Sequence, residues 1–307
     1  MVTFSLQASP SDAASWIELA RRAEAAGYDA LLAADHPGAV ATPFVALAAA
    51  ASVTTTIGLG SYVANAGIRE PMLLAADVAT LDLVSGGRAR LGIGAGHTPA
   101  EWRAVGRERP DVAGRVRRAV AVTEAVRALL DGDEVTVDTD DLVVRAARLD
   151  TPRPVQRRVP VTVGTANSTL LRWAGAHADV VGLAGLGRTL PDGYMHEVRW
   201  RVADIEAQLA HVAAGAEGRA EPPALEALVQ RVVVTDDAEA AAAELAGQTG
   251  LDVEELLATP YVLIGTEDEI VAAVDGHRRR WGITRYVVRA EALDALAPVL
   301  PRVAALS

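Results

Sequence analysis

The hydrophobic pattern of the chain consists of short apolar runs that alternate with longer amphipathic stretches. Within the short runs, apolar residues occupy consecutive positions, which is typical of parallel strands buried on both faces. The strand candidates are residues 2–8, 28–34, 57–63, 89–93, 159–164, 179–182, 228–234 and 283–288. Eight such runs in 307 residues favour a closed (β/α)8 TIM barrel of the α/β class over an open doubly wound sheet.

The stretches between these runs predict helices with recognisable ends. Residues 11–26 form the first one, with Ser11 or Asp12 as its N-cap. Pro43 and Pro71 begin two more, because proline is favoured in the first turn of a helix. Later helices are expected at residues 111–131, 167–176, 236–246, 266–280 and 291–305, with another that ends near residue 216.

Two other segments bear on the domain organisation. Residues 135–144 alternate apolar and polar positions around a polar turn, which predicts a hairpin inserted between helix and strand. The proline-rich residues 152–158 form a connection. Because the chain shows neither a linker nor a repeat, we expect residues 1–307 to form a single barrel domain with insertion segments.

The amino-acid composition excludes several classes of catalytic site and of binding partner. The chain has no cysteine and no lysine, which excludes disulfides, thiolate catalysis, Schiff-base catalysis and a P-loop. Its net charge of −11 argues against a nucleic-acid partner. The first apolar run follows no basic region, and no uncharged apolar stretch reaches about 20 residues. We therefore expect a soluble, cytoplasmic protein with no membrane partner.

In such a barrel, functional groups lie on the loops that follow the strands. Asp35-His36 follows the second strand, where the histidine is placed to donate a proton or to bind a ligand. The alternative interpretation is a simple turn, since Pro37 and Gly38 come next. Ser61 to Gly67 follow the third strand, and their glycine and asparagine residues predict unusual backbone geometry or an ordinary loop.

Two glycine-containing loops follow later strands. Gly92 to His97 resemble a dinucleotide fingerprint but lack its third glycine, so we reject Rossmann-type binding. The glycines still allow backbone to approach a flat ring, and His97 is either a ligand contact or a solvated side chain. Gly164 to Thr169 open a helix, so their amides form an anion site or are capped by Asn167 or Ser168.

The other motifs indicate structure rather than chemistry. Ser85 to Arg88 lie between a helix and the next strand, at the opposite end of the barrel, and predict a helix C-cap. The six histidines include no ligand cluster, so no metal site is expected. His177, His211 and His277 lie within helices or at their ends and are expected to be solvated or capping.

Over nearly its whole length, the sequence resembles the bacterial luciferase-like flavin and deazaflavin oxidoreductases. The most specific block runs from Ala79 to Arg88 and on through Leu91 to Gly96. The weaker blocks, which occur in the same order as in the family, are residues 23–31, 35–36, 71–75, 152–156, 178–179 and 264–270.

The resemblance implies a barrel that is usually dimeric, has an insertion after strand six or seven, and binds coenzyme F-420 (a 5-deazaflavin) or FMN at its C-terminal mouth. It implies a cis peptide between Tyr62 and Val63, a phosphate-holding helix start and a small-molecule substrate. The implied catalytic residues are His36 and His97. The implied cofactor-binding residues are Asp35, Ser61, Tyr62, Val63, Asn65, Ala95, Gly96, Thr98, Gly164, Thr165, Ala166 and Asn167.

The subfamily that these motifs resemble uses the deazaflavin, which implies hydride transfer; an FMN-dependent monooxygenase and a non-catalytic flavin-binding homologue are the alternatives. The carboxylate tail of the deazaflavin requires arginines at the mouth, and the candidates are Arg69, Arg103, Arg107 and Arg188. Two departures from the family pattern are Pro37, where an aromatic residue is frequent, and His97, where some members have glutamate. Residues 184–196 are a candidate lid, with Arg188, Tyr194 or His196 as specificity residues.

Overall fold

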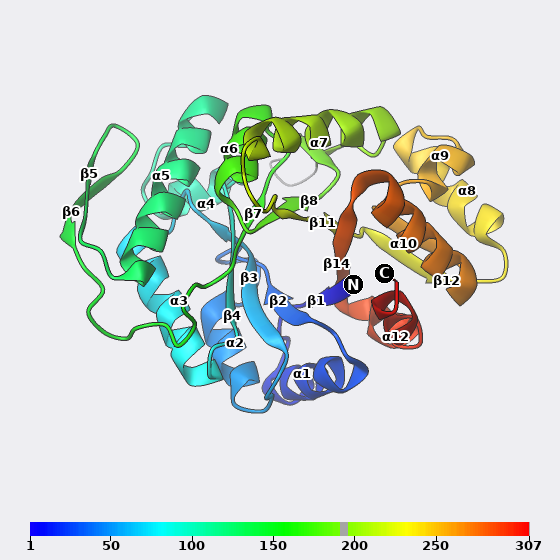
Figure 1. Ribbon diagram of the computed structural model, residues 1–307, viewed down its shortest axis with the longest axis horizontal. Coiled ribbons are helices and arrows are strands. Elements are labelled where there is room, and N and C mark those ends of the chain that lie inside the picture. Colours follow the sequence, from blue (N-terminus) through cyan, green and yellow to red (C-terminus); the bar gives the residue numbers. More distant parts are fainter. Residues whose placement is uncertain (191–195, 307) are drawn as a thin grey trace.

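A computed structural model describes residues 1–190 and 196–306 of the chain. Its centre is a closed barrel of eight parallel strands in the order β1-β14-β11-β8-β7-β4-β3-β2 (Figure 1). The barrel strands are β1 (Thr3–Gln7), β2 (Ala30–Ala33), β3 (Gly58–Asn65), β4 (Ala89–Gly94), β7 (Val161–Gly164), β8 (Val180–Leu183), β11 (Ala224–Leu228) and β14 (Ile283–Arg289). The predicted (β/α)8 barrel is thereby confirmed.

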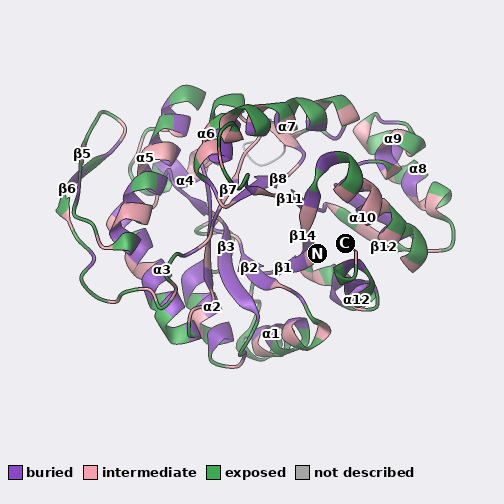
Figure 2. Ribbon diagram, in the orientation of Figure 1, coloured by how far each residue is buried: buried purple, intermediate pink, exposed green. Residues whose placement is uncertain are grey.

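The helices surround the barrel and bury their inner faces against the strands, while their outer faces are exposed (Figure 2). They are α1 (Ala13–Ala26), α2 (Pro43–Ala51), α3 (Pro71–Ser85), α4 (Pro99–Ala104), α5 (Val112–Asp131), α6 (Ser168–His177), α7 (Val202–Ala216), α8 (Ala238–Thr249), α9 (Val253–Leu257), α10 (Glu267–Trp281), α11 (Leu293–Leu296), α12 (Leu300–Ala304) and the 3-10 turn η1 (Ala290–Ala292). None of the helices described is both long and apolar enough to cross a membrane.

Local chemistry explains the helix ends that the sequence indicates. Asp12 caps α1 by accepting a hydrogen bond from the Ser15 amide at 2.9 Å, and Gly27 ends that helix in the left-handed conformation. Gly86 ends α3 in the same way, as predicted for the Ser85–Arg88 motif. The motif lies at the N-terminal end of the barrel, where the Arg88 guanidinium donates to the Ile57 carbonyl at 2.8 Å.

Insertions extend the barrel at three places. The predicted hairpin is formed by β5 (Val135–Asp138) and β6 (Val143–Ala147), which stand at the outer edge beyond α5 (Figure 1). After the sixth barrel strand, β9 (Leu186–Thr189) pairs antiparallel with β10 (His196–Val198). After the seventh, β12 (Arg231–Val234) pairs in parallel with β13 (Val262–Gly265) outside the barrel. Insertions after strands six and seven agree with the family resemblance.

The predicted seventh strand, residues 228–234, is wrong in position. The barrel uses β11, which ends at Leu228, and residues 231–234 form the outlying β12. The cause is Glu226, a charged residue that is 4% exposed inside the barrel and interrupts the apolar run of β11. The apolar stretch that follows looks more like a buried strand, although its residues are partly exposed. That residues 1–307 form one domain stays a prediction.

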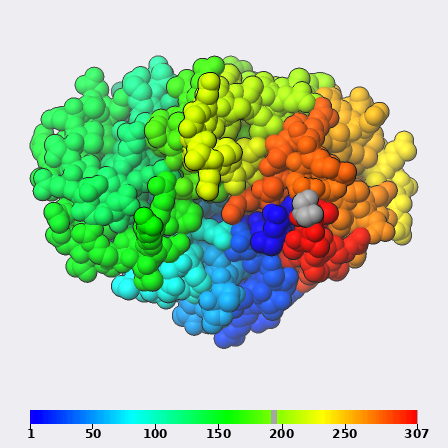
Figure 3. All heavy atoms as spheres, viewed as in Figure 1, coloured from blue at the N-terminus to red at the C-terminus, as the bar shows by residue number. Residues whose placement is uncertain are grey.

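The barrel closes between the first and the last of its strands. β1 lies between β14 and β2, with Phe4 opposite Tyr286 and Leu6 opposite Leu31. In the space-filling view the blue N-terminal end of the chain lies beside its orange and red C-terminal segments (Figure 3). This closure fixes the position of the strand ends, and therefore of the loops that carry the candidate site.

Candidate functional site at the mouth of the barrel

The strand pairing places the four predicted stretches at one rim. Ala33 of β2 lies beside Ser61 of β3, and Asn65 at the end of β3 lies beside Gly94 of β4. β4 in turn pairs with β7, which ends at Gly164. The segments 35–36, 61–67, 94–98 and 164–168 therefore follow neighbouring strands at the C-terminal mouth.

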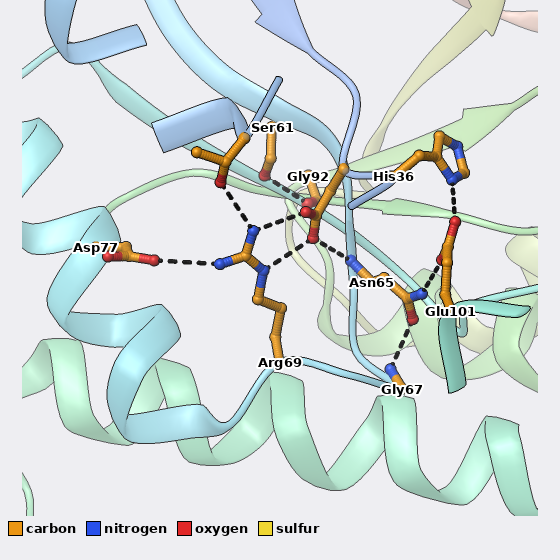
Figure 4. Close-up of polar contacts among 10 residues, drawn as sticks. His36, Ser61, Asn65, Gly67, Arg69, Asp77, Gly92 and Glu101 are labelled. Carbon is orange, nitrogen blue, oxygen red and sulfur yellow. Dashed lines mark hydrogen bonds and ion pairs between the residues drawn. The ribbon is translucent and has the colours of Figure 1, made fainter. Parts of the chain in front are cut away.

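Asp35 is the buried anchor of this rim. Its carboxylate, 1% exposed, accepts two hydrogen bonds from the Arg69 guanidinium, at 2.7 and 3.0 Å, and one from the Asn65 amide at 3.0 Å. Arg69 also lies 3.5 Å from Asp77 (Figure 4). A bidentate pair of this kind fixes the loop after β2 against the end of β3.

A second chain of hydrogen bonds leads from Asn65 to His36. The Asn65 side-chain amide donates to Oε2 of Glu101 at 2.6 Å, and Oε1 of Glu101 lies 2.6 Å from Nδ1 of His36 (Figure 4). Asn65 and Glu101 are buried, whereas the His36 side chain is 38% exposed. The buried carboxylate thus holds one ring nitrogen of a histidine that faces the mouth.

The electrostatics of His36 follow from this contact. The hydrogen bond to Glu101 raises the pKa of His36, against the opposing effect of burial. With a carboxylate beside Nδ1, the proton of the neutral ring lies on that nitrogen, so Nε2 is the atom left to exchange a proton with a ligand. His36 can therefore act as a general acid or base at the mouth.

His97 lies in a different electrostatic setting. Its ring meets those of His36 and His196 edge to face, with centroids 5.4 and 4.6 Å apart. Burial and the two neighbouring imidazoles lower the pKa of His97 to about 4. At neutral pH His97 is uncharged, which suits a hydrogen-bonding contact better than charge stabilisation. Among the residues described, no group of three or more histidine, aspartate or glutamate side chains is arranged to hold a metal ion.

Glycines of β4 and β7 make room for the side chain of Val63 in β3. The predicted cis peptide between Tyr62 and Val63 is present, and the β3–β4 register shifts there. A Cβ at Gly94 would lie 2.8 Å from Cγ2 of Val63, and one at Gly164 would lie 3.1 Å from its Cγ1. The Tyr62 carbonyl accepts a hydrogen bond from the Gln7 side chain at 2.7 Å. Gln7 therefore holds the Tyr62 carbonyl of this peptide, and the Val63 side chain packs against the backbone of Gly94 and Gly164.

The helix start after β7 is capped by its own side chains. Oδ1 of Asn167 accepts hydrogen bonds from the Thr169 and Leu170 amides at 3.0 and 3.1 Å, and Thr165 accepts one from the Asn167 amide at 3.0 Å. The N-capping interpretation of this segment is confirmed. Those three amides are engaged, so a phosphate at α6 would rely on the remaining backbone of residues 164–168.

The remaining predicted residues take supporting places. Thr98 is buried and precedes α4, Ser61 donates to the Gly92 carbonyl at 2.8 Å, and Gly96 has a left-handed backbone beside the Asn65 side chain. His196 begins β10 and reaches His97. Arg188 forms an exposed ion pair with Glu197 at 3.0 Å. Tyr194 lies outside the described residues.

Two residues that contact this site were not singled out from the sequence: Gln7 and Glu101. Thr98-Pro99-Ala100-Glu101 carries a recognisable signal, because a polar residue, a proline and an early acid mark a helix start. That signal could have indicated α4, which was not predicted, but it gives no indication that Glu101 turns inward to meet His36, 65 residues away in the sequence. Gln7 ends β1 and carries no motif.

A cavity of about 320 Å³ lies inside the barrel, on the side of the strand N-terminal ends, and Ser61 and Tyr62 of β3 are among its lining residues. Its lining includes Ser5, Arg90, Arg158, Thr162, Asp179, Glu226 and Arg285. Burial raises the pKa of Glu226 to about 7, and the Tyr62 hydroxyl lies beside it. The barrel beneath the mouth is therefore polar and charged rather than filled with aliphatic side chains.

Comparison with known proteins agrees with this architecture. The family model of the luciferase-like monooxygenases matches residues 2–257. The chain is 32% identical over 167 residues to 4-hydroxyprotoasukamycin monooxygenase from Streptomyces nodosus subsp. asukaensis, a match that covers 52% of this chain and 44% of that protein. It is 28% identical over 172 residues to the F-420-dependent glucose-6-phosphate dehydrogenase of Amycolatopsis mediterranei, covering 53% and 51%. The matches span about half the length of these relatives.

The fold has solved counterparts as well. The coenzyme F-420-dependent tetrahydromethanopterin reductase from Methanopyrus kandleri superimposes with a TM-score of 0.75 at 20% identity. The alignment covers 98% of this chain and 99% of that one. At this identity the likeness is one of fold.

Proposed function

Because this chain belongs to the family of luciferase-like monooxygenases, we propose that it is an oxidoreductase that transfers hydride between coenzyme F-420 and a small organic substrate. The observation that carries the proposal is the 2.6 Å contact between Nδ1 of His36 and Oε1 of Glu101, which supports a role for Nε2 of His36 in proton exchange. A relative at 28% identity is itself named as F-420-dependent.

The residues at the mouth fit a flat ring with an anionic tail. Gly94 and Gly164 leave room for the Val63 side chain, which packs over their backbone, and the partly exposed Val63 gives a ring an apolar surface to lie against. The residues proposed to hold the cofactor are Asp35, Ser61, Tyr62, Val63, Asn65, Ala95, Gly96, Thr98, Gly164, Thr165, Ala166 and Asn167. When bound, the deazaflavin supplies the carbon that accepts or donates hydride.

In this proposal the residues of the chain handle the proton that accompanies the hydride. Glu101 holds Nδ1 of His36, so that Nε2 donates a proton to the substrate oxygen on reduction or takes one on oxidation. His97, uncharged at neutral pH, orients the substrate or ring by hydrogen bonding. Asp35 and Arg69 keep the loop of His36 in place.

A second candidate is an FMN-dependent monooxygenase, which the 32%-identical monooxygenase relative favours. The two functions predict different cofactors, and a non-catalytic homologue predicts no turnover with either. The proposal also includes a homodimer in the cytoplasm, to be tested by sedimentation of the purified protein and by fractionation of its host cells.

The cofactor test uses the purified protein with oxidised and reduced coenzyme F-420 and FMN. We expect micromolar or tighter binding of the deazaflavin, followed by fluorescence quenching, and no oxygen consumption with reduced FMN above that of buffer. His36→Asn should keep the deazaflavin affinity within about threefold and abolish turnover of any alcohol or ketone found active in a substrate screen. Tight binding of FMN alone, with oxygen consumption, would overturn the proposal in favour of the second candidate.

A further inference from the structure

The cavity inside the barrel, at the N-terminal ends of the strands, is a polar compartment of considerable size. Its volume is about 320 Å³, whereas about 10–15 Å³ is enough to hold one water molecule, so it has room for a small ligand. Arg158, with a side chain that is 58% exposed, and the partly exposed Asp179 are among its lining residues. The cavity therefore communicates with solvent at the end of the barrel opposite to the mouth.

A layer of mostly apolar side chains lies between this cavity and the mouth. Its members are Ala30, Leu32, Tyr62, Leu228 and Val287. Glu226 and Arg285 precede Leu228 and Val287 by two residues on β11 and β14, so their side chains point inward one layer closer to the N-terminal ends. The cavity is therefore a compartment distinct from the candidate site at the mouth.

Glu226 lines the cavity with a carboxyl group that is not fully hydrogen-bonded. The residue is 4% exposed, and its Oε1 is buried without a hydrogen bond to any residue that the structure describes. In the strand register Glu226 lies between Gly182 of β8 and Arg285 of β14. A Cβ at Gly182 would lie 3.1 Å from the Tyr62 hydroxyl, which therefore lies beside the strand of Glu226. A buried carboxyl group with an unpartnered oxygen is costly, and a hydrogen-bonding group held in the cavity lowers that cost.

Two arginines at the cavity share a single carboxylate. Arg90 donates to both oxygens of Asp29, at 2.5 and 3.0 Å, and its side chain crosses β3 over Gly58, where a Cβ would lie 2.6 Å from its Nε. Nη1 of Arg285 lies 3.4 Å from the same carboxylate, which is its one ion pair within the described part of the chain. Because a guanidinium group has five N–H donors, most of those of Arg285 remain for other partners.

The same imbalance is found at the entrance of the cavity. Arg127 and Arg158 both pair with Asp179, at 2.7 and 3.1 Å. Together with Arg90 and Arg285, four guanidinium groups thus share two carboxylates, while Glu226 forms no ion pair with a described residue. Counted over these groups, positive charge is in excess whether Glu226 is ionised or protonated. An excess of this sign favours an anion as the ligand.

We propose that this cavity binds a small oxyanion, such as phosphate, sulfate or a short carboxylate, which is held by Arg285 and Glu226. Arg285 supplies N–H donors in the planar arrangement that oxyanions accept. Glu226 in its protonated form donates its O–H to the anion, and the hydroxyl groups of Ser5 and Thr162 line the same space as further donors. The site is independent of the cofactor proposed for the mouth.

The anion and a proton on Glu226 are expected to bind together. Burial raises the pKa of Glu226 to about 7, and the groups that face it are Arg285 of β14, Tyr62 of β3, Arg90 of β4 and Asp29 before β2. The two arginines favour the ionised carboxylate, whereas an oxyanion next to it favours the protonated form. Above pH 7, binding of the oxyanion therefore includes the uptake of one proton from solvent by Glu226.

The first test measures binding of inorganic phosphate, sulfate and acetate to the purified chain by isothermal titration calorimetry near pH 6. We expect Arg285→Gln to weaken binding about tenfold to a hundredfold, because it removes a charged donor. The matched control is Arg278→Gln, since the Arg278 side chain is 25% exposed and pairs with Asp275 at 2.9 Å away from the cavity. The control should change the affinity less than twofold. The anion that binds most tightly identifies the ligand as a phosphate-like or a carboxylate compound.

The second test uses sulfate, because its own charge does not change between about pH 6 and pH 8. We expect the affinity of the wild type to fall about tenfold over this range as Glu226 ionises. In Glu226→Gln the amide donates at every pH, so the affinity should stay within about twofold. Calorimetry in buffers of different protonation enthalpy should show proton uptake with sulfate at pH 8 in the wild type and none in Glu226→Gln.

Three outcomes would overturn the proposed site. The first is the absence of any binding at millimolar anion concentrations, which would leave the cavity to water. The second is an affinity that Arg285→Gln does not change, as expected for an anion bound at the start of α6 or on the surface. The third is the same pH dependence in the wild type and in Glu226→Gln. If Arg285→Gln does not fold, the comparison with Glu226→Gln decides alone.

Discussion

Oε1 of Glu101 lies 2.6 Å from Nδ1 of His36, and its other oxygen is bound by the Asn65 side chain at 2.6 Å. The carboxylate thereby ties the loop after β2 to the end of β3 through the first turn of α4. This single side chain sets both the orientation and the protonation of the candidate catalytic histidine.

Glu101→Gln is expected to lower the pKa of His36, because it removes the carboxylate whose hydrogen bond raises that pKa. NMR titration of the imidazole measures the effect, with Glu108→Gln, an exposed glutamate nearby, as the control. In the wild type, the pair stabilises the fold fully below about pH 6.5, and this contribution is lost as pH rises through the raised pKa of His36. An unchanged His36 titration in Glu101→Gln would contradict the assigned contact.

Asp35→Asn is expected to destabilise the protein by about 3–5 kcal/mol, because it leaves the guanidinium of Arg69 without its buried partner. Urea denaturation measures this change. The matched control is Asp77→Asn, since Asp77 faces the same guanidinium at 3.5 Å but its side chain is 42% exposed. The control substitution should lower the free energy of unfolding by at most about 1 kcal/mol. Equal effects of the two substitutions would show that Asp35 does not anchor the rim.

Gly94→Ala is expected to weaken cofactor binding about tenfold, because the added Cβ would lie 2.8 Å from Cγ2 of Val63 and displace it. The double variant that combines Gly94→Ala with Val63→Ala should regain part of the cofactor affinity, because the shorter side chain at position 63 leaves room for the added Cβ. Gly247→Ala in α8 is the control, since a Cβ there meets nothing within 4 Å. That control should gain about 0.5–1 kcal/mol in stability. A Gly94→Ala variant with wild-type affinity would show that the Val63 surface does not contact the ring.

Glu226→Gln is expected to make the protein more stable above pH 7. Burial raises the pKa of Glu226 to about 7, so the folded state holds a proton that the unfolded chain releases near pH 4.5. Wild-type stability should therefore fall as pH rises from about 4.5 to 7, by about 3 kcal/mol in total. Denaturation at several pH values measures this slope, which Glu226→Gln should lack. Parallel curves for the two proteins would show that Glu226 is charged throughout.

The sequence predicts most of the fold for a physical reason. Strands buried on both faces leave a continuous apolar signature, and their alternation with helices leaves few topologies besides the barrel. The exception is β11, where Glu226 lies inside the barrel and removes that signature. A buried carboxyl group whose neighbours Arg285, Tyr62 and Arg90 are far away in the sequence cannot be recognised as internal from local sequence.

The site is predictable to a different extent. Its location follows from the rule that loops after parallel strands share one rim, which brings Asp35, Asn65 and Gly96 together. The contacts within the site could not be predicted in this way, because Glu101 reaches His36 from α4, a helix that was not predicted from the sequence. The arginines show the same limit, since only the structure shows that Arg69 and Arg107 are already paired with carboxylates.

The pairing of β1 with β14 has a consequence for synthesis on the ribosome. The opening strand keeps one unsatisfied edge until residues 283–289 have emerged, so the rim around His36 cannot acquire its final shape earlier. A nascent chain halted before β14 would present two open edges, at β1 and β11, and would be prone to self-association.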